Sequence, residues 1–93
     1  MSHILVLEDE LAIQLGYQLT LTDAGYTVKV MSSGKGLLEA MPGVDLVITD
    51  ILMPDVDVME VIKQLKEQYP EVPIIAISGG GRVGADFYLK TSK

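Results

Sequence analysis

Short runs of apolar residues alternate along the chain with longer segments whose apolar positions have helical spacing. Each run predicts a buried β-strand, because about four to eight apolar residues in succession suit a strand covered on both faces. We expect these strands at residues 4–7, 27–31, 44–49 and 73–77. Strands that alternate with helices are typical of a parallel sheet with helices on its faces.

The segments between the strands predict three helices, at residues 10–24, 33–41 and 58–69. Gly25 ends the first helix, because glycine most readily adopts the left-handed conformation found just beyond a helix. Ser33 stands where its side chain can cap the second helix. The predicted fold class is therefore α/β with a doubly wound parallel sheet.

Composition narrows the class of protein further. A chain of 93 residues has room for one domain, and a hydrophobic content of 48% argues against disorder. The net charge of -6, without a basic cluster, argues against direct binding of nucleic acid. No apolar run approaches the roughly 20 residues of a membrane-spanning helix. The lack of cysteine and of a signal-type N-terminus favours the cytoplasm.

Carboxylates follow two of the predicted strands. Glu8 and Asp9 come directly after the strand at 4–7, and Asp50 follows the apolar run at 44–49. Because the carboxyl ends of parallel strands meet at one edge of a sheet, where ligands bind, we expect one pocket. Three carboxylates in a pocket repel one another unless a hard cation neutralises them. The sequence therefore predicts a Mg2+ site.

Three stretches, at residues 4–10, 45–57 and 73–78, together resemble the receiver domain of two-component response regulators. The resemblance covers essentially the whole chain and implies a doubly wound sheet with the strand order 2-1-3-4-5. For this chain we predict a single receiver domain over residues 1–93, shortened at its C-terminus. It would have four strands in the order 2-1-3-4, with strand five and helix five missing.

The resemblance also implies roles for individual residues. Asp50 would accept the phosphoryl group, and Glu8, Asp9 and Asp50 would hold Mg2+ with help from the backbone carbonyl of Leu52. Ser78 would be the hydroxyl switch residue that binds the new phosphoryl group. The implied partners are a histidine kinase as phosphodonor and a downstream protein. Any enzymatic activity would be at most Mg2+-dependent self-phosphorylation and self-dephosphorylation at Asp50.

Two departures from the family pattern stand out. Val58 takes a position where the family usually has glycine, so the turn after Asp50 must form without the conformational freedom of glycine. Residues 87–90 invite comparison with the family's fifth strand and its lysine, here Lys90. Residues 79–86 are, however, too few for a parallel crossover. Residues 79–82 followed by 87–90 also resemble a family variant in which this stretch leads into, and forms, helix four. We therefore predict a helix at 87–90 and give Lys90 no phosphate-binding role.

The first predicted helix carries leucines on two sides. Leu11, Leu15 and Leu19 lie on successive turns, nearly opposite the stripe that we expect to face the core, which consists of Ile13, Tyr17, Leu21 and Ala24. Three exposed leucines in a row predict an interface, and we expect self-association through this helix. The alternative is that leucine is there simply as a good helix former.

Two other functions remain open on the sequence. The first is an oligomeric interaction module that derives from a receiver domain and acts without phosphorylation. The second is a Mg2+-dependent phosphatase of the haloacid dehalogenase type, in which a second aspartate follows the first by two positions. Leu52 occupies that second position here, which disfavours the phosphatase.

Overall fold

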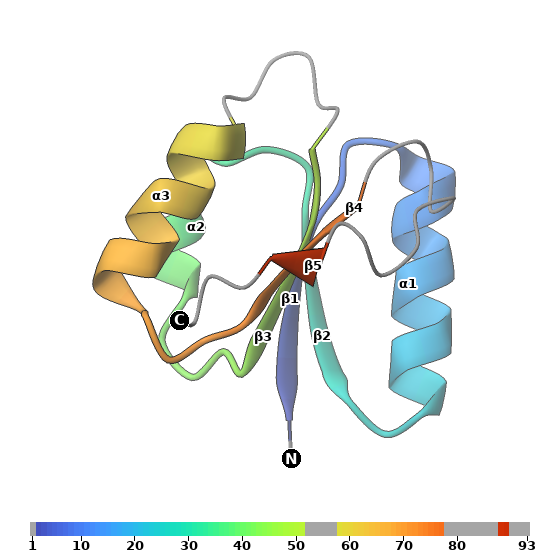
Figure 1. Ribbon diagram of the computed structural model, residues 1–93. Helices are drawn as coiled ribbons and strands as arrows, with labels where there is room; N and C mark the ends of the chain where they lie inside the picture. The colour runs from blue at the N-terminus through green and yellow to red at the C-terminus, as the bar shows by residue number, and fades with distance from the viewer. Residues whose placement is uncertain (1, 52–57, 78–87, 90–93) are drawn as a thin grey trace.

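A β-sheet lies between two helical layers in the computed structural model, which describes residues 2–51, 58–77 and 88–89 (Figure 1). One helix covers one face of the sheet, and two helices cover the other. The elements in chain order are β1 (His3–Leu7), α1 (Leu11–Asp23), β2 (Thr27–Met31), α2 (Leu37–Ala40), β3 (Leu46–Asp50), α3 (Val58–Gln68), β4 (Ile74–Ile77) and β5 (Tyr88–Leu89). The four predicted strands and the first and third helices are confirmed with small shifts of their bounds.

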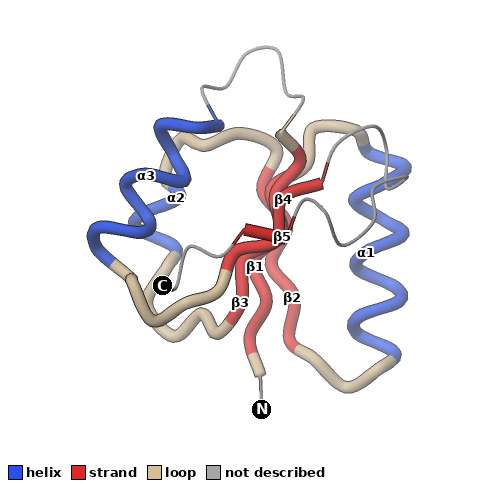
Figure 2. Tube along the Cα trace, viewed as in Figure 1, coloured by secondary structure: helices blue, strands red, loops and turns tan. Residues whose placement is uncertain are grey.

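The strands have the order β2-β1-β3-β4-β5 (Figure 2). The first four are parallel, which confirms the predicted order 2-1-3-4. Leu7 of β1 is opposite Thr49 of β3, and Asp50 of β3 is opposite Ile77 of β4. The carboxyl ends of β1, β3 and β4 therefore meet at one edge of the sheet. The strand order reverses between β1 and β3, which is where such sheets bind ligands.

The chain forms no helix at the last two described residues. Tyr88 and Leu89 form the short strand β5, which runs antiparallel to β4 and pairs with Ile75 and Ile74. The predicted helix over 87–90 is therefore wrong for these two residues. The preceding segment is too short for a parallel crossover, as the prediction assumed, but an antiparallel return requires far fewer residues.

The second helix is shorter than predicted. It covers only Leu37–Ala40, and its N-cap is Gly36 with a φ of 80°, a left-handed conformation that glycine tolerates. Ser33 is not the cap; its Oγ accepts a local hydrogen bond from the Lys35 amide, at 3.3 Å. The reason is local, because glycine is a poor helix former and the left-handed backbone at Gly36 interrupts the helix before Leu37.

The larger core lies between the sheet and the layer of α2 and α3. Its buried residues come from strands, helices and loops: Leu5, Leu7, Leu37, Met41, Val44, Val47, Val58, Ile62, Leu65, Val72 and Ile74. A smaller cluster on the α1 side is buried only at Ile4, Val6 and Ile48. The predicted inward stripe of α1 is half-buried at Ile13, Tyr17 and Leu21, whereas Ala24 is exposed, so its assignment to the core is wrong.

Candidate functional site

The sheet itself positions the acidic residues at its edge. The amide of Glu8 donates to the carbonyl of Met31 at 2.9 Å, which continues the pairing of β1 with β2. Asp50 is the last residue of β3, and the next amide, of Ile51, donates to the carbonyl of Ile77 at 2.8 Å. The backbone that carries the carboxylates is thus fixed by strand pairing on both sides of the switch point.

The side chains of Glu8, Asp9 and Asp50 come together at this edge. One carboxylate oxygen from each lies within 4.8 Å of the other two. Glu8 is only 4% exposed, Asp50 is half-buried and Asp9 is exposed. The cluster is therefore anchored in the protein at one end and open to solvent at the other, an arrangement that a small ligand can enter.

The charges in the cluster act against one another. Burial raises the pKa of Glu8, and the negative charges of Asp50, Asp9 and Glu10 raise it further. The amide of Glu10 opposes this in part by donating to the Glu8 carboxylate at 3.0 Å. A bound divalent cation would relieve the repulsion, and carboxylate oxygens are the ligands that Mg2+ and Ca2+ prefer. The residues present therefore fit a hard metal ion.

The sequence analysis did not identify three residues near the cluster as parts of the site. Gln14 donates from its side-chain amide to the carbonyl of Glu8, and buried Thr49 donates to the carbonyl of Asp50 at 3.2 Å. Tyr17 has a raised pKa, caused first by burial and then by the charges of Glu8 and Asp50. The available signal was position, since Gln14 and Tyr17 occupy the first turns of the helix that follows the acidic residues.

Of the other predicted site residues, Leu52 and Ser78 lie outside the described residues, and the rest do not gather at this edge of the sheet. Leu11, Leu15 and Leu19 are exposed along α1. Val58, the residue at the family's glycine position, is the first residue of α3 and is buried in the larger core.

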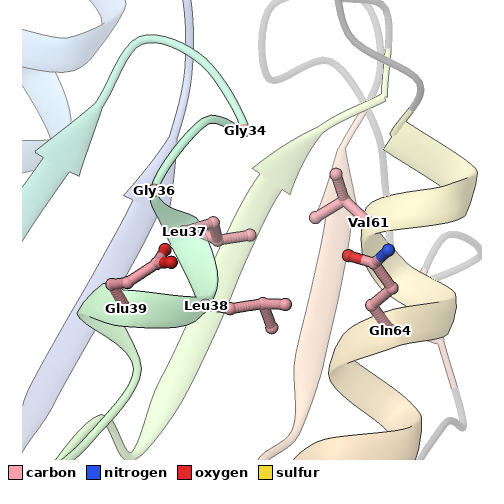
Figure 3. A pocket seen from close by; sticks show the side chains of 7 residues that line it. All are labelled: Gly34, Gly36, Leu37, Leu38, Glu39, Val61 and Gln64. Atoms are coloured by element: carbon pink, nitrogen blue, oxygen red, sulfur yellow. The ribbon is translucent and has the colours of Figure 1, made fainter.

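A small pocket opens between α2 and α3, and Glu8, Asp9 and Asp50 are not among the residues that line it (Figure 3). Its volume is about 90 Å³, and its walls consist of Gly34, Gly36, Leu37, Leu38, Glu39, Val61 and Gln64. Pockets that bind small molecules usually measure about 300 to 1,000 Å³. This pocket is therefore too small to compete with the acidic cluster as a functional site.

Comparisons with known proteins identify relatives along most of the chain. The sequence model of the family described as response regulator receiver domain matches residues 4–87. The sensor kinase CckA of Brucella abortus is 35% identical over an alignment of 80 positions, which covers 82% of this chain and 8% of that protein. The regulator TorR of Escherichia coli is 38% identical over an alignment of 98 positions, which covers 94% of this chain and 42% of that protein. The chain thus spans less than half the length of both.

Solved structures show the same fold. The receiver domain of TorR has a TM-score of 0.80 and 36% identity, with 98% of this chain and 78% of that chain covered. The response regulator TrrA of Thermotoga maritima, solved in complex with Mg(2+)-BeF, has a TM-score of 0.75 and 31% identity. That match covers 84% of this chain and 70% of the other. Among the described residues, none of the helices has the length and apolar character required to span a membrane.

Proposed function

Since the chain belongs to the response regulator receiver family, we propose that Asp50 accepts a phosphoryl group from a histidine kinase. The observation that carries this proposal is the meeting of three carboxylates within 4.8 Å at the switch point of the sheet. Of the three, Asp50 is the nucleophile, because it lies on the central strand β3 and is half-buried beside solvent. In this proposal Glu8, Asp9 and Asp50 would hold Mg2+, with the backbone carbonyl of Leu52 as a further ligand.

The reaction joins an oxygen of the Asp50 carboxylate to phosphorus while the bond from phosphorus to the donor histidine nitrogen breaks. The electron pair of the broken bond stays on the histidine, which then takes up a proton. Mg2+ bound at this site supplies the positive charge that two reacting anions require. Glu8 and Asp9 contribute as its ligands, and the hydrogen bond between the Glu10 amide and Glu8 holds that carboxylate in place.

Ser78 is the proposed contact for the new phosphoryl group. It follows Ile77 directly in the sequence, and Ile77 is paired with Asp50 in the sheet. A hydroxyl next to that pair can donate a hydrogen bond to an oxygen of the phosphoryl group and carry the change to the segment that follows. A downstream protein recognises this change, as is typical of receiver domains. The relative TrrA, whose structure contains Mg(2+)-BeF, supports a Mg2+ site in this chain.

The experiment is intact-protein mass spectrometry after incubation with Mg2+ and acetyl phosphate, a small acyl phosphate. We expect the wild-type chain to gain one phosphoryl group and the Asp50→Asn variant to gain none. Asp23→Asn is the matched control, because it makes the same change at the far end of α1. No gain in a folded, Mg2+-binding wild-type sample would favour the interaction module that acts without phosphorylation. Steady release of phosphate from a simple ester would favour the phosphatase, which the family match disfavours.

A further inference from the structure

The outer face of α1 is unusually apolar for a surface. Leu11 is 67% exposed, Leu15 is 50% exposed and Leu19 is 71% exposed. Spacing of four residues places the three side chains on one side of the helix, one turn apart. Figure 1 shows α1 as the outermost described element on its side of the sheet, and the exposure of the three leucines places them on the side of α1 that the described core leaves uncovered. A row of exposed leucines is typical of a surface that another molecule covers.

Gly16 directly follows Leu15 in α1 and is exposed. It lies in the middle of the helix and has no positive φ that would require glycine. Within the described part of the chain, a Cβ atom at this position would meet nothing within 4 Å. Glycine destabilises a helix interior relative to alanine, so Gly16 lowers the stability of α1 although the backbone conformation there does not require glycine. A second helix packed closely against Leu15 would account for it, since the missing side chain lets two backbones approach.

The charge of the molecule favours a second copy as the occupant. The chain has a net charge of -6, whereas α1 carries no lysine or arginine and has Asp23 as its single acidic residue. This helix has too few charged side chains to form ion pairs with a strongly charged partner. Two acidic copies, by contrast, can meet without close repulsion only where their surfaces are nearly uncharged. A leucine row can also face its own copy across a twofold axis, which is how most soluble dimers form.

We propose that the chain forms a twofold dimer in which two α1 helices pack antiparallel through Leu11, Leu15 and Leu19. Leu15 lies at the centre next to Gly16, and Leu11 lies opposite Leu19 of the second copy. A parallel pair would bring the two clusters around Glu8 together. The antiparallel pair separates them by about the helix length, roughly 20 Å at 1.5 Å per residue. This dimer does not depend on phosphorylation of Asp50, so the two proposals can fail separately.

The expected dimer is weak. One helix from each copy buries less than the roughly 1,600 Å² of a standard interface, so the equilibrium should depend on concentration in the range used for solution studies. We would measure it by sedimentation equilibrium over a series of protein concentrations. The wild-type chain should shift from monomer to dimer as its concentration rises.

Charged substitutions test which face is involved. Leu15→Glu combined with Leu19→Glu should raise the dimer dissociation constant about 100-fold or more, because two buried leucines are lost and like charges are introduced. Met59→Glu is the matched control: Met59 is 64% exposed, but it lies on α3 in the other helical layer. It should leave the dissociation constant unchanged. Equal weakening by both variants would contradict the assignment to α1.

Gly16→Leu tests the close approach of the helices without endangering the fold. No atom of the described residues lies within 4 Å of a Cβ atom at this position, and leucine is a better helix former than glycine, so thermal stability should hold or rise. The dissociation constant should rise at least about tenfold, because the added side chain keeps the backbones apart. Unchanged or tighter dimerisation of Gly16→Leu would overturn the proposal. A wild-type chain that stays monomeric at every concentration would also overturn it and would assign the leucines to a different protein partner.

Discussion

The two faces of the sheet are built unequally. On one face, α2 and α3 contribute buried side chains to the larger core, among them Leu37, Ile62 and Leu65. On the other face, α1 has no buried residue within the described part of the chain, although it is the longest helix there. The smaller cluster is buried only through strand residues, with Tyr17 and Leu21 packed at its margin. The helix beside the acidic site is therefore held by less apolar burial than the helices opposite.

This difference indicates that one face of the sheet mainly stabilises the fold and that the other face carries the functional residues. Burial of apolar surface is the main stabilising contribution in a small domain, so the α2 and α3 face should carry most of the free energy of folding. The α1 face carries the residues around the acidic cluster, including Gln14 and Tyr17, and the exposed leucines. Segments with little buried area open most readily, and they are also where ligands and partners most easily act.

The largest predicted effect is on stability and tests this asymmetry. Leu65→Ala should lower the free energy of unfolding by about 3 kcal/mol, because Leu65 is 1% exposed and its loss leaves a cavity. Leu21→Ala on α1 makes the same chemical change at a half-buried position and should cost about 1 kcal/mol. Urea denaturation of both variants measures the difference. Equal losses would show that α1 is as firmly packed as α3.

The next effect concerns Mg2+. The raised pKa of Glu8 means that the fold disfavours its charged form. Protonated Glu8 therefore stabilises the fold relative to ionised Glu8. This stabilisation is lost as the pH rises through the folded pKa of Glu8. At neutral pH without metal, Glu8→Gln should therefore raise the melting temperature. Mg2+ at about 100 times its dissociation constant should stabilise the wild type by about 2.7 kcal/mol, and Glu8→Gln should lose most of that gain.

Acid should weaken the same Mg2+ site. Protons and metal compete for the carboxylates, and the raised pKa of Glu8 moves this competition to a higher pH than for an ordinary glutamate. Isothermal titration with Mg2+ at several pH values measures the trend. A Mg2+ affinity that is constant from neutral pH down through the acid range would contradict a site that contains Glu8.

The smallest effect belongs to Tyr17. Its pKa is raised, so the neutral phenol is favoured in the fold, and this contribution is fully present below the ordinary value of 10.0 and is lost as the pH rises through the folded pKa. The loss should be below about 1 kcal/mol, because Tyr17 is partly exposed to solvent. Tyr17→Phe should reduce the fall in melting temperature above pH 10.0, which thermal melts of the wild type and the variant at several pH values would measure.

The sequence predicted the fold well where one residue pattern dominates. The apolar runs at β1 and β3 specify buried strands, and the carboxylates that follow them must then share an edge. It predicted α2 poorly, because the left-handed backbone at Gly36 overrides the capping signal of Ser33. It also missed β5, because a two-residue strand is specified by its pairing with β4 and has no pattern of its own.

The site was predictable only in part for a related reason. Glu8, Asp9 and Asp50 were identifiable because Glu8 and Asp9 follow β1 directly and Asp50 ends β3, and the order of strands brings their side chains together. The supporting contacts of Gln14 and Thr49 depend on how side chains turn once the sheet has formed. No spacing pattern in a sequence predicts hydrogen bonds of this kind.

The most direct test of the account is to locate the phosphoryl group on the chain. After incubation with Mg2+ and acetyl phosphate, borohydride reduces an aspartyl phosphate to homoserine, and peptide mass mapping identifies the position that has changed. The account predicts homoserine at position 50 in the wild type, and none when Mg2+ is removed with a chelator. Modification at Asp9 instead, or at no aspartate in a folded sample with Mg2+ bound, would contradict the assignment of Asp50 as the phosphoacceptor.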